Sequence, residues 1–257
     1  MRSKAFVVSA RALFLALSLG AFATSVAGCS SESAPSEAGS EDDYKASDFP
    51  EDTVLPYAGD WLDAPKALAG IGQFDRLKTT IHDDAKCSTM VAVAAAIVGG
   101  RERFTTFLDS VAKLREGRSD DLAIIEDVRA ASAEKRLTPR HIHSLTEAVV
   151  RAYGVAHGAF DGQISKMVRA SGYTIVPVGS KVPTVLVDHL EPRDVVPLAT
   201  IADNEAHITL LWKDARGTVR LYDSDDIKGH VMARGSAGYR LRVEDAQSTW
   251  DLAQIYR

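Results

Sequence analysis

Three residues of this 257-residue sequence have the side-chain types that an activated nucleophile requires. Cys87 stands at the start of the apolar run "CSTMVAVAAAIVGG", and His207 and Asp223 stand at the two ends of "HITLLWKDARGTVRLYD". In such a site the thiol attacks, the imidazole accepts its proton because its pKa lies near working pH, and a carboxylate orients the imidazole. The sequence therefore predicts a Cys–His–Asp triad.

The position of Cys87 agrees with this prediction. The polar stretch 82–86 gives way to the apolar run at Cys87, and if Asp84 or Ala85 caps the helix, the thiol lies in its first turn. Unpaired backbone N–H groups there favour a thiolate and could also receive an oxyanion. The alternative is a structural cysteine that fills space in an apolar helix.

The pairing of His207 with Asp223 depends on the register of a predicted hairpin. If Trp212 pairs with Thr218, His207 lies directly opposite Asp223; if Asp214 pairs with Thr218 around a glycine bulge, Asp223 is the diagonal neighbour of His207. Both registers keep the two side chains on one face, with Cβ atoms roughly 5–8 Å apart. An even, four-residue loop would place them on opposite faces.

In order and type, these residues resemble the papain-like cysteine peptidase superfamily, and in particular its bacterial C39-like and toxin or effector branches. The resemblance covers most of residues 80–226. It implies Cys87 as nucleophile, His207 as general base and acid, and Asp223 as the orienting residue, with no metal or organic cofactor. It also implies an α+β fold with a helical lobe, whose central Cys-bearing helix packs on a C-terminal antiparallel β-sheet.

The sequence departs from that family just before the cysteine. The family often supplies an oxyanion donor from a glutamine there, whereas this chain has His82, Asp83 and Asp84, and its nearest glutamine is Gln73. His82 or backbone N–H groups would have to take that part.

Several functions are compatible with these residues. The favoured one is hydrolysis of a peptide or isopeptide bond through an acyl-enzyme, and the same triad could transfer the acyl group to an amine or deamidate glutamine. A catalytically silent papain-like binding lipoprotein and an unrelated domain with Cys87 in its core are the alternatives from other classes.

Helical periodicity dominates the first part of the chain and strand patterns the second, which indicates an α+β fold with a largely antiparallel sheet. Helices are expected at 64–81, 87–100, 101–117, 119–136, 138–154 and 158–173, with Ser119 and Thr138 as N-caps. Strands are expected at 173–179, 183–190, 195–201, 206–213, 218–224, 238–245 and 251–257.

The N-terminus has the pattern of an export signal. Basic residues precede an apolar segment, and "VAGC" resembles the bacterial lipobox, so residues 1–28 are predicted to be a signal peptide and Cys29 a lipidated residue. Residues 29–52 read as an acidic tether that cannot bury enough apolar surface to fold, and 53–257 as the folded domain. The predicted location is the bacterial cell envelope, with a membrane anchor and a peptide or protein substrate.

Charge and spacing exclude other classes of site. Without the leader the chain has 27 basic and 35 acidic residues; the tether holds eight of those acids and one lysine, so the domain carries a net charge near −1 and no basic cluster for nucleic acid. His141 and His143 stand two apart in a predicted helix, cannot share a metal ion well, and are expected at the surface. With Cys29 assigned to lipid, Cys87 has no disulfide partner.

Overall fold

The protein is described by a computed structural model that covers residues 51–71, 86–155, 161–202, 205–224, 231–244 and 253–257. Within these residues the fold is α+β, as the sequence predicts, and every strand pairing is antiparallel. The helices are α1 Ala64–Ile71, α2 Lys86–Gly99, α3 Arg101–Leu114, α4 Ser119–Ala133, α5 Pro139–Tyr153, α6 Asp161–Arg169, α7 Pro183–Asp188 and α8 Ala237–Glu244.

Among the described residues, six strands form the main sheet, in the order β3-β8-β4-β5-β6-β7. A separate small hairpin, β1 Tyr57–Ala58 and β2 Trp61–Leu62, precedes α1. The strands of the main sheet are β3 Ile175–Val176, β4 Val195–Ala202, β5 Glu205–Lys213, β6 Val219–Tyr222, β7 Val231–Ala233 and β8 Ile255–Tyr256.

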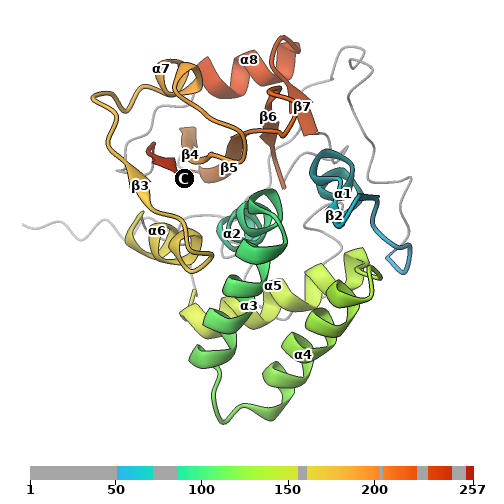
Figure 1. Ribbon diagram of the computed structural model, residues 1–257. Coiled ribbons are helices and arrows are strands. Elements are labelled where there is room, and N and C mark those ends of the chain that lie inside the picture. Colours follow the sequence, from blue (N-terminus) through green and yellow to red (C-terminus); the bar gives the residue numbers. More distant parts are fainter. Residues whose placement is uncertain (1–50, 72–85, 156–160, 203–204, 225–230, 245–252) are drawn as a thin grey trace, which may run out of the picture.

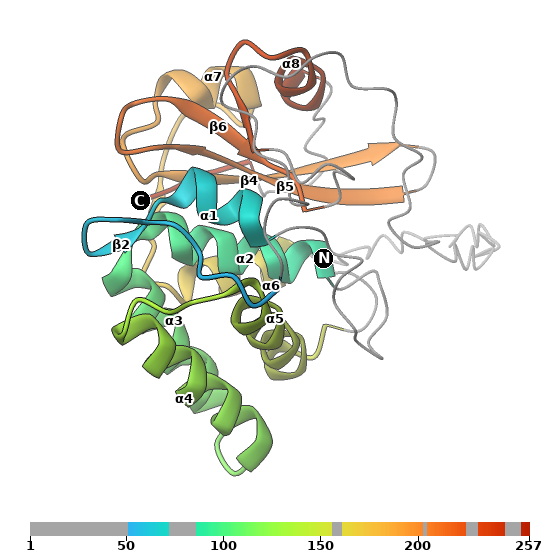
Figure 2. The same ribbon diagram turned by 90° about the vertical axis from the view of Figure 1, so that its right-hand side faces the viewer.

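Helices cover both faces of this sheet (Figures 1 and 2). On one face α2 packs against β4 and β5, and it is itself surrounded by α1, α3, α5 and α6. On the other face α7 and α8 pack together, and α8 also contacts β7. The sheet therefore separates two apolar cores, a large one around α2 and a smaller one beneath α7 and α8.

Helix α2 is buried on all sides because nearly every residue from Cys87 to Val98 is small or apolar. Its alanines let neighbouring elements approach closely, and Trp61 donates a hydrogen bond to the carbonyl of Ile97 at 2.8 Å. A central Cys-bearing helix that packs on an antiparallel sheet is thus present in the structure.

Two segments predicted as strands are helices. Residues 183–190 contain α7, which begins at Pro183 and buries Leu186 and Val187 against the sheet. Residues 238–245 contain most of α8, where the backbone N–H of Tyr239 donates to Ser236 Oγ at 3.2 Å. The β-branched residues favoured strands, but burial of one helical face against the sheet outweighs that weak preference.

The expected N-cap of α4 is also wrong, whereas that of α5 is confirmed. Arg118, not Ser119, is the N-cap of α4, and it accepts the backbone hydrogen bond of Leu122 at 3.0 Å. Thr138 caps α5, Pro139 is its first residue, and Gly154 ends it in the left-handed conformation.

Candidate active site

Cys87 is the second residue of α2 and lies in its first turn, as the sequence predicts. Only 3% of the residue is exposed. The first-turn N–H groups of a helix have no intrahelical acceptor, so this position favours a thiolate or an oxyanion near the backbone. Burial of the residue works against a thiolate, because an apolar environment disfavours a charged sulfur.

His207 and Asp223 are brought together by the β5–β6 hairpin. His207 Nε2 lies 2.6 Å from Asp223 Oδ1, and the Asp223 side chain is fully buried. The carboxylate accepts this hydrogen bond, so the imidazole hydrogen resides on Nε2. The predicted pairing of a strand-opening histidine with the aspartate after the next strand is present in the structure.

The register is the second of the two that the sequence allows. Leu210 pairs with Tyr222 and Lys213 with Val219, and the backbone N–H of Asp214 donates to the carbonyl of Thr218 at 2.9 Å. The three-residue loop therefore makes Asp223 the diagonal neighbour of His207.

Asp214 fixes the hairpin loop that sets this register. Its Oδ1 accepts from the backbone N–H groups of Arg216 at 2.9 Å and Thr218 at 2.8 Å. Its Oδ2 accepts from Arg220 Nε at 2.8 Å, and both partners of this ion pair are buried. Gly217, with φ of 84°, supplies the left-handed residue that such a bulged loop needs.

Thr209 is a neighbour of this pair that the sequence analysis did not identify. One step beyond the last paired residues, the β5–β6 register places Thr209 directly opposite Asp223. Thr209 is buried, and its Oγ1 has no hydrogen-bond partner among the described residues. The hairpin register places Thr209 opposite Asp223, so the sequence could have identified this residue if the loop length had been known.

The two faces of β5 pack against different helices. Ile208 and Leu210 belong to the core around α2, whereas Leu211 belongs to the core beneath α7 and α8. Because side chains alternate along a strand, His207 starts on the face of Leu211, opposite to α2. Helix α2 nevertheless packs against β5 (Figure 2), so the strand that carries His207 is a direct neighbour of the helix that carries Cys87.

The remaining predicted site residues lie outside the described residues. His82, the oxyanion candidate, falls between α1 and α2, and Cys29 falls in the segment before residue 51. Where the described chain begins, Asp52 already binds Arg140 of α5 through two hydrogen bonds of 2.7 and 3.0 Å. None of the helices in the described ranges is long and apolar enough to span a bilayer.

The expectation that His141 and His143 are surface residues is wrong for His143, and His141 is only partly exposed. His141 completes a capping box with Thr138 at the start of α5. His143 is buried, and its Nε2 lies 2.9 Å from the carbonyl oxygen of Ile71 at the end of α1. Both histidines hold α5 in place, and no group of three or more metal-ligating side chains occurs in the part of the chain that the structure describes.

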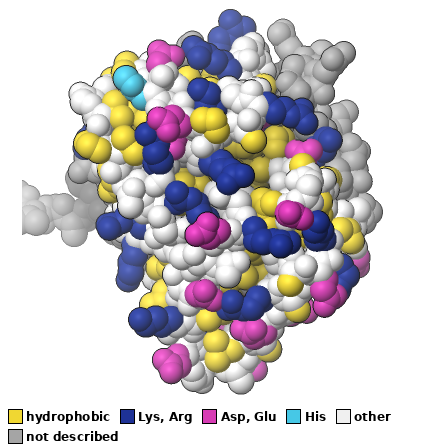
Figure 3. All heavy atoms as spheres, viewed as in Figure 1, with side chains coloured by type: hydrophobic (Ala, Val, Ile, Leu, Met, Phe, Trp, Pro, Cys, Tyr) yellow, Lys and Arg dark blue, Asp and Glu magenta, His cyan; other side chains and the backbone are white. Residues whose placement is uncertain are grey.

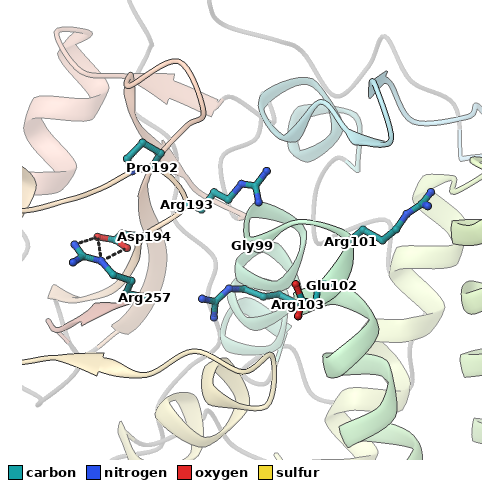
Figure 4. Close-up of a pocket in the computed structure, with 8 residues that line it drawn as sticks. All are labelled: Gly99, Arg101, Glu102, Arg103, Pro192, Arg193, Asp194 and Arg257. Carbon is teal, nitrogen blue, oxygen red and sulfur yellow. Dashed lines mark hydrogen bonds and ion pairs between the residues drawn. The ribbon is translucent and has the colours of Figure 1, made fainter.

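A pocket of about 290 Å³ lies at the opposite end of α2 from Cys87 (Figure 4). It is lined by the end of α2, the start of α3, the segment before β4, and the C-terminal Arg257. None of the three predicted triad residues lines it. We call it the arginine pocket, because four of its lining residues are Arg101, Arg103, Arg193 and Arg257.

Comparison with known proteins adds no relative from which a site can be transferred. The chain matches no protein-family model, no curated protein and no solved structure. The chemistry of the site must therefore be argued from its own residues.

Proposed function

We propose that this protein is a papain-like thiol hydrolase that cleaves a peptide or isopeptide bond through an acyl-enzyme on Cys87. The observation that carries the proposal is the contact of 2.6 Å between His207 Nε2 and the buried carboxylate of Asp223. A buried aspartate that holds a histidine at a strand end is the arrangement that orients a general base. The cysteine in the first turn of α2 supports the proposal, because it offers backbone donors to the reacting oxygen.

The chemistry follows from which ring nitrogen Asp223 engages. With its hydrogen on Nε2, the His207 imidazole takes the thiol proton on Nδ1, and the thiolate of Cys87 attacks the acyl carbon. The imidazolium then returns the proton to the leaving amine, and a thioester remains. Attack by water completes hydrolysis, attack by an amine gives acyl transfer, and a glutamine side chain as substrate gives deamidation.

We also propose that the domain acts at the bacterial cell envelope, anchored by lipid on Cys29. The lipobox-like "VAGC" and the acidic stretch that follows it support this location. A peptide or protein at the membrane surface is then the substrate within reach of the tether.

A catalytically silent binding domain is the second candidate, and two observations favour it. Cys87 is 97% buried, and strand alternation directs His207 toward the sheet face opposite to α2. In that case the His207–Asp223 pair stabilises the hairpin, and Cys87 is a core residue of α2.

Alkylation of the folded protein separates these two functions. Cys29→Ser leaves Cys87 as the only thiol, since the sequence contains two cysteines. If Cys87 is the nucleophile, iodoacetamide modifies it well below about pH 8, where an unperturbed thiol is mostly protonated. His207→Ala should slow this reaction by about tenfold or more at pH 7. His189→Ala, which removes an exposed histidine after α7, should leave the rate unchanged.

Asp223→Asn tests the orienting role, because an amide keeps the shape but can hold the imidazole in the wrong tautomer. It should slow alkylation as His207→Ala does, while circular dichroism shows a folded protein. Reaction of Cys87 only after unfolding would reject the enzyme and leave the binding domain.

A further inference from the structure

The arginine pocket carries more positive than negative charge. Its lining holds four arginines against two acids, Glu102 and Asp194, which leaves a net charge of +2. Basic side chains, with some acidic ones between them, also gather across the middle of the face shown in Figure 3. The domain as a whole is close to neutral, so this pocket concentrates a charge that the rest of the surface lacks.

The acids of the pocket neutralise only one of its arginines. Arg257 binds Asp194 through two nitrogens, with Nη2 at 2.7 Å and Nε at 3.0 Å, and it also pairs with Glu191 at 3.1 Å. Asp194 is buried beneath this contact. Arg103 and Arg193 have no ion pair with any residue that the structure describes.

Arg193 occupies a backbone conformation that its side chain makes costly. The N–H of Asp194 donates to the carbonyl of Glu191 at 3.0 Å, which closes a turn with Pro192 second and Arg193 third. Arg193 has φ of 74°, and the third position of a type II turn, which needs a positive φ, normally holds glycine. A side chain held at a costly backbone conformation points to a functional site, here around the Arg193 guanidinium.

The guanidinium of Arg193 lies against the junction of α2 and α3. Its Nη1 is 3.4 Å from the position that a β-carbon on Gly100 would occupy. Because only Gly100 separates the end of α2 from the start of α3, the dipoles of the two helices offset each other here. The positive charge at this place therefore comes from the arginines.

Arg103 faces the same recess with an unsatisfied donor. Its guanidinium carbon lies 3.9 Å from the centre of the Tyr173 ring, and its Nη1 is buried without a hydrogen-bond partner among the described residues. Figure 4 shows Arg103 extending toward the Asp194–Arg257 pair, whereas Arg101 points away from the other arginines. A buried guanidinium nitrogen without an acceptor is costly, and an anion in the recess would supply one.

We infer that the arginine pocket binds the phosphate group of a small phosphoester or of a phospholipid headgroup. Planar guanidinium groups match phosphate oxygens bidentately, and two of them without protein carboxylates suit a dianion. The volume of about 290 Å³ exceeds that of a bare phosphate and leaves room for part of an organic group. This site lies at the other end of α2 from Cys87, so it does not depend on the proposed hydrolase activity.

Binding of inorganic phosphate to the full-length protein tests this inference. Calorimetry at constant ionic strength should show saturable binding, and Arg193→Gly should raise the dissociation constant by about tenfold or more, as expected when a charge-assisted hydrogen bond is lost. Arg103→Met should do the same. Without phosphate, Arg193→Gly should melt at the same temperature as the natural protein or higher, because glycine relieves the strained backbone.

Lys135→Gly is the matched control. Lys135 also has a positive φ, 56°, but its Nζ binds Asp60 and the carbonyl of Gly59 instead of lining the pocket. This variant loses one positive charge and one strained residue, and it should bind phosphate as the natural protein does. Absence of saturable phosphate binding, or equal weakening by Lys135→Gly and Arg193→Gly, would overturn the inference.

Vesicles distinguish the two sources of phosphate. With Cys29→Ser, so that no N-terminal lipid contributes, flotation with phosphatidylglycerol but not phosphatidylcholine vesicles identifies a lipid headgroup, provided that Arg193→Gly abolishes it. Phosphate binding without flotation identifies a soluble phosphoester. Flotation that Arg193→Gly leaves unchanged would overturn the lipid assignment.

Discussion

Replacing Asp214 by alanine should destabilise the protein far more than its position in a hairpin loop suggests. The substitution leaves the buried guanidinium of Arg220 without its partner, and losing one member of a buried ion pair costs about 3–5 kcal/mol. The backbone N–H of Thr218 also loses its acceptor, which adds about 1 kcal/mol. With a urea dependence of about 2 kcal/mol per molar, the midpoint of unfolding should fall by roughly 2–3 M.

Two further variants establish the cause. Arg220→Met in the Asp214→Ala background removes the unpaired charge and should recover about half of the lost free energy of unfolding. Asp109→Ala breaks an ion pair of similar length, Arg129 to Asp109 at 2.7 Å, whose side chains are 34% and 60% exposed, and it should cost less than about 1 kcal/mol. Urea unfolding followed by circular dichroism measures all three variants. Equal costs for Asp214→Ala and Asp109→Ala would refute the reasoning.

Two other predictions concern packing and pH. Gly99→Ala should lower the free energy of unfolding by about 1–3 kcal/mol in urea titrations, because its β-carbon would lie 2.8 Å from Arg103 Cβ and 2.9 Å from the Tyr173 hydroxyl; an unchanged midpoint would contradict this packing. Burial raises the pKa of Tyr239 to about 12, so the folded protein keeps a proton that the unfolded chain releases near pH 10, and stability should fall between pH 10 and 12 by about 1.4 kcal/mol per pH unit from this residue. Tyr239→Phe should remove that part of the fall in urea titrations across this range, and an identical pH dependence in both proteins would show that Tyr239 contributes nothing.

Local sequence signals predicted the ends of a helix correctly where residues at those ends bind the unpaired backbone groups of the same helix. Thr138, Pro139 and Gly154 predicted both ends of α5, because a cap, a fixed φ and a left-handed residue act within one turn of the chain. Local signals did not predict α8, because its strand-favouring residues led to the prediction of a strand. The N-cap at Ser236 and the helical spacing of the buried Tyr239 and Val243 were overlooked. Packing against the sheet decided that segment.

The environment of the histidines in α5 shows the same limit. Their spacing in the sequence correctly argued against a shared metal ion, but it did not reveal that His143 is buried beside Ile71. That contact joins two helices 72 residues apart in sequence, and no local pattern encodes it.

The sequence by itself determined that Cys87 lies in the first turn of a helix and that His207 and Asp223 stand at the open end of one hairpin, whereas the register that brings them together came from the structure. The first two relations follow from helical and strand periodicity, and the pairing depends on the parity of a short loop that only the structure fixed. Only the tertiary structure decided on which side of the sheet α2 packs. Strand β5 has Ile208, Leu210 and Trp212 on one face and Leu211 on the other, because helices cover both faces of the sheet. A strand that is apolar on both faces contains no signal for which face meets α2.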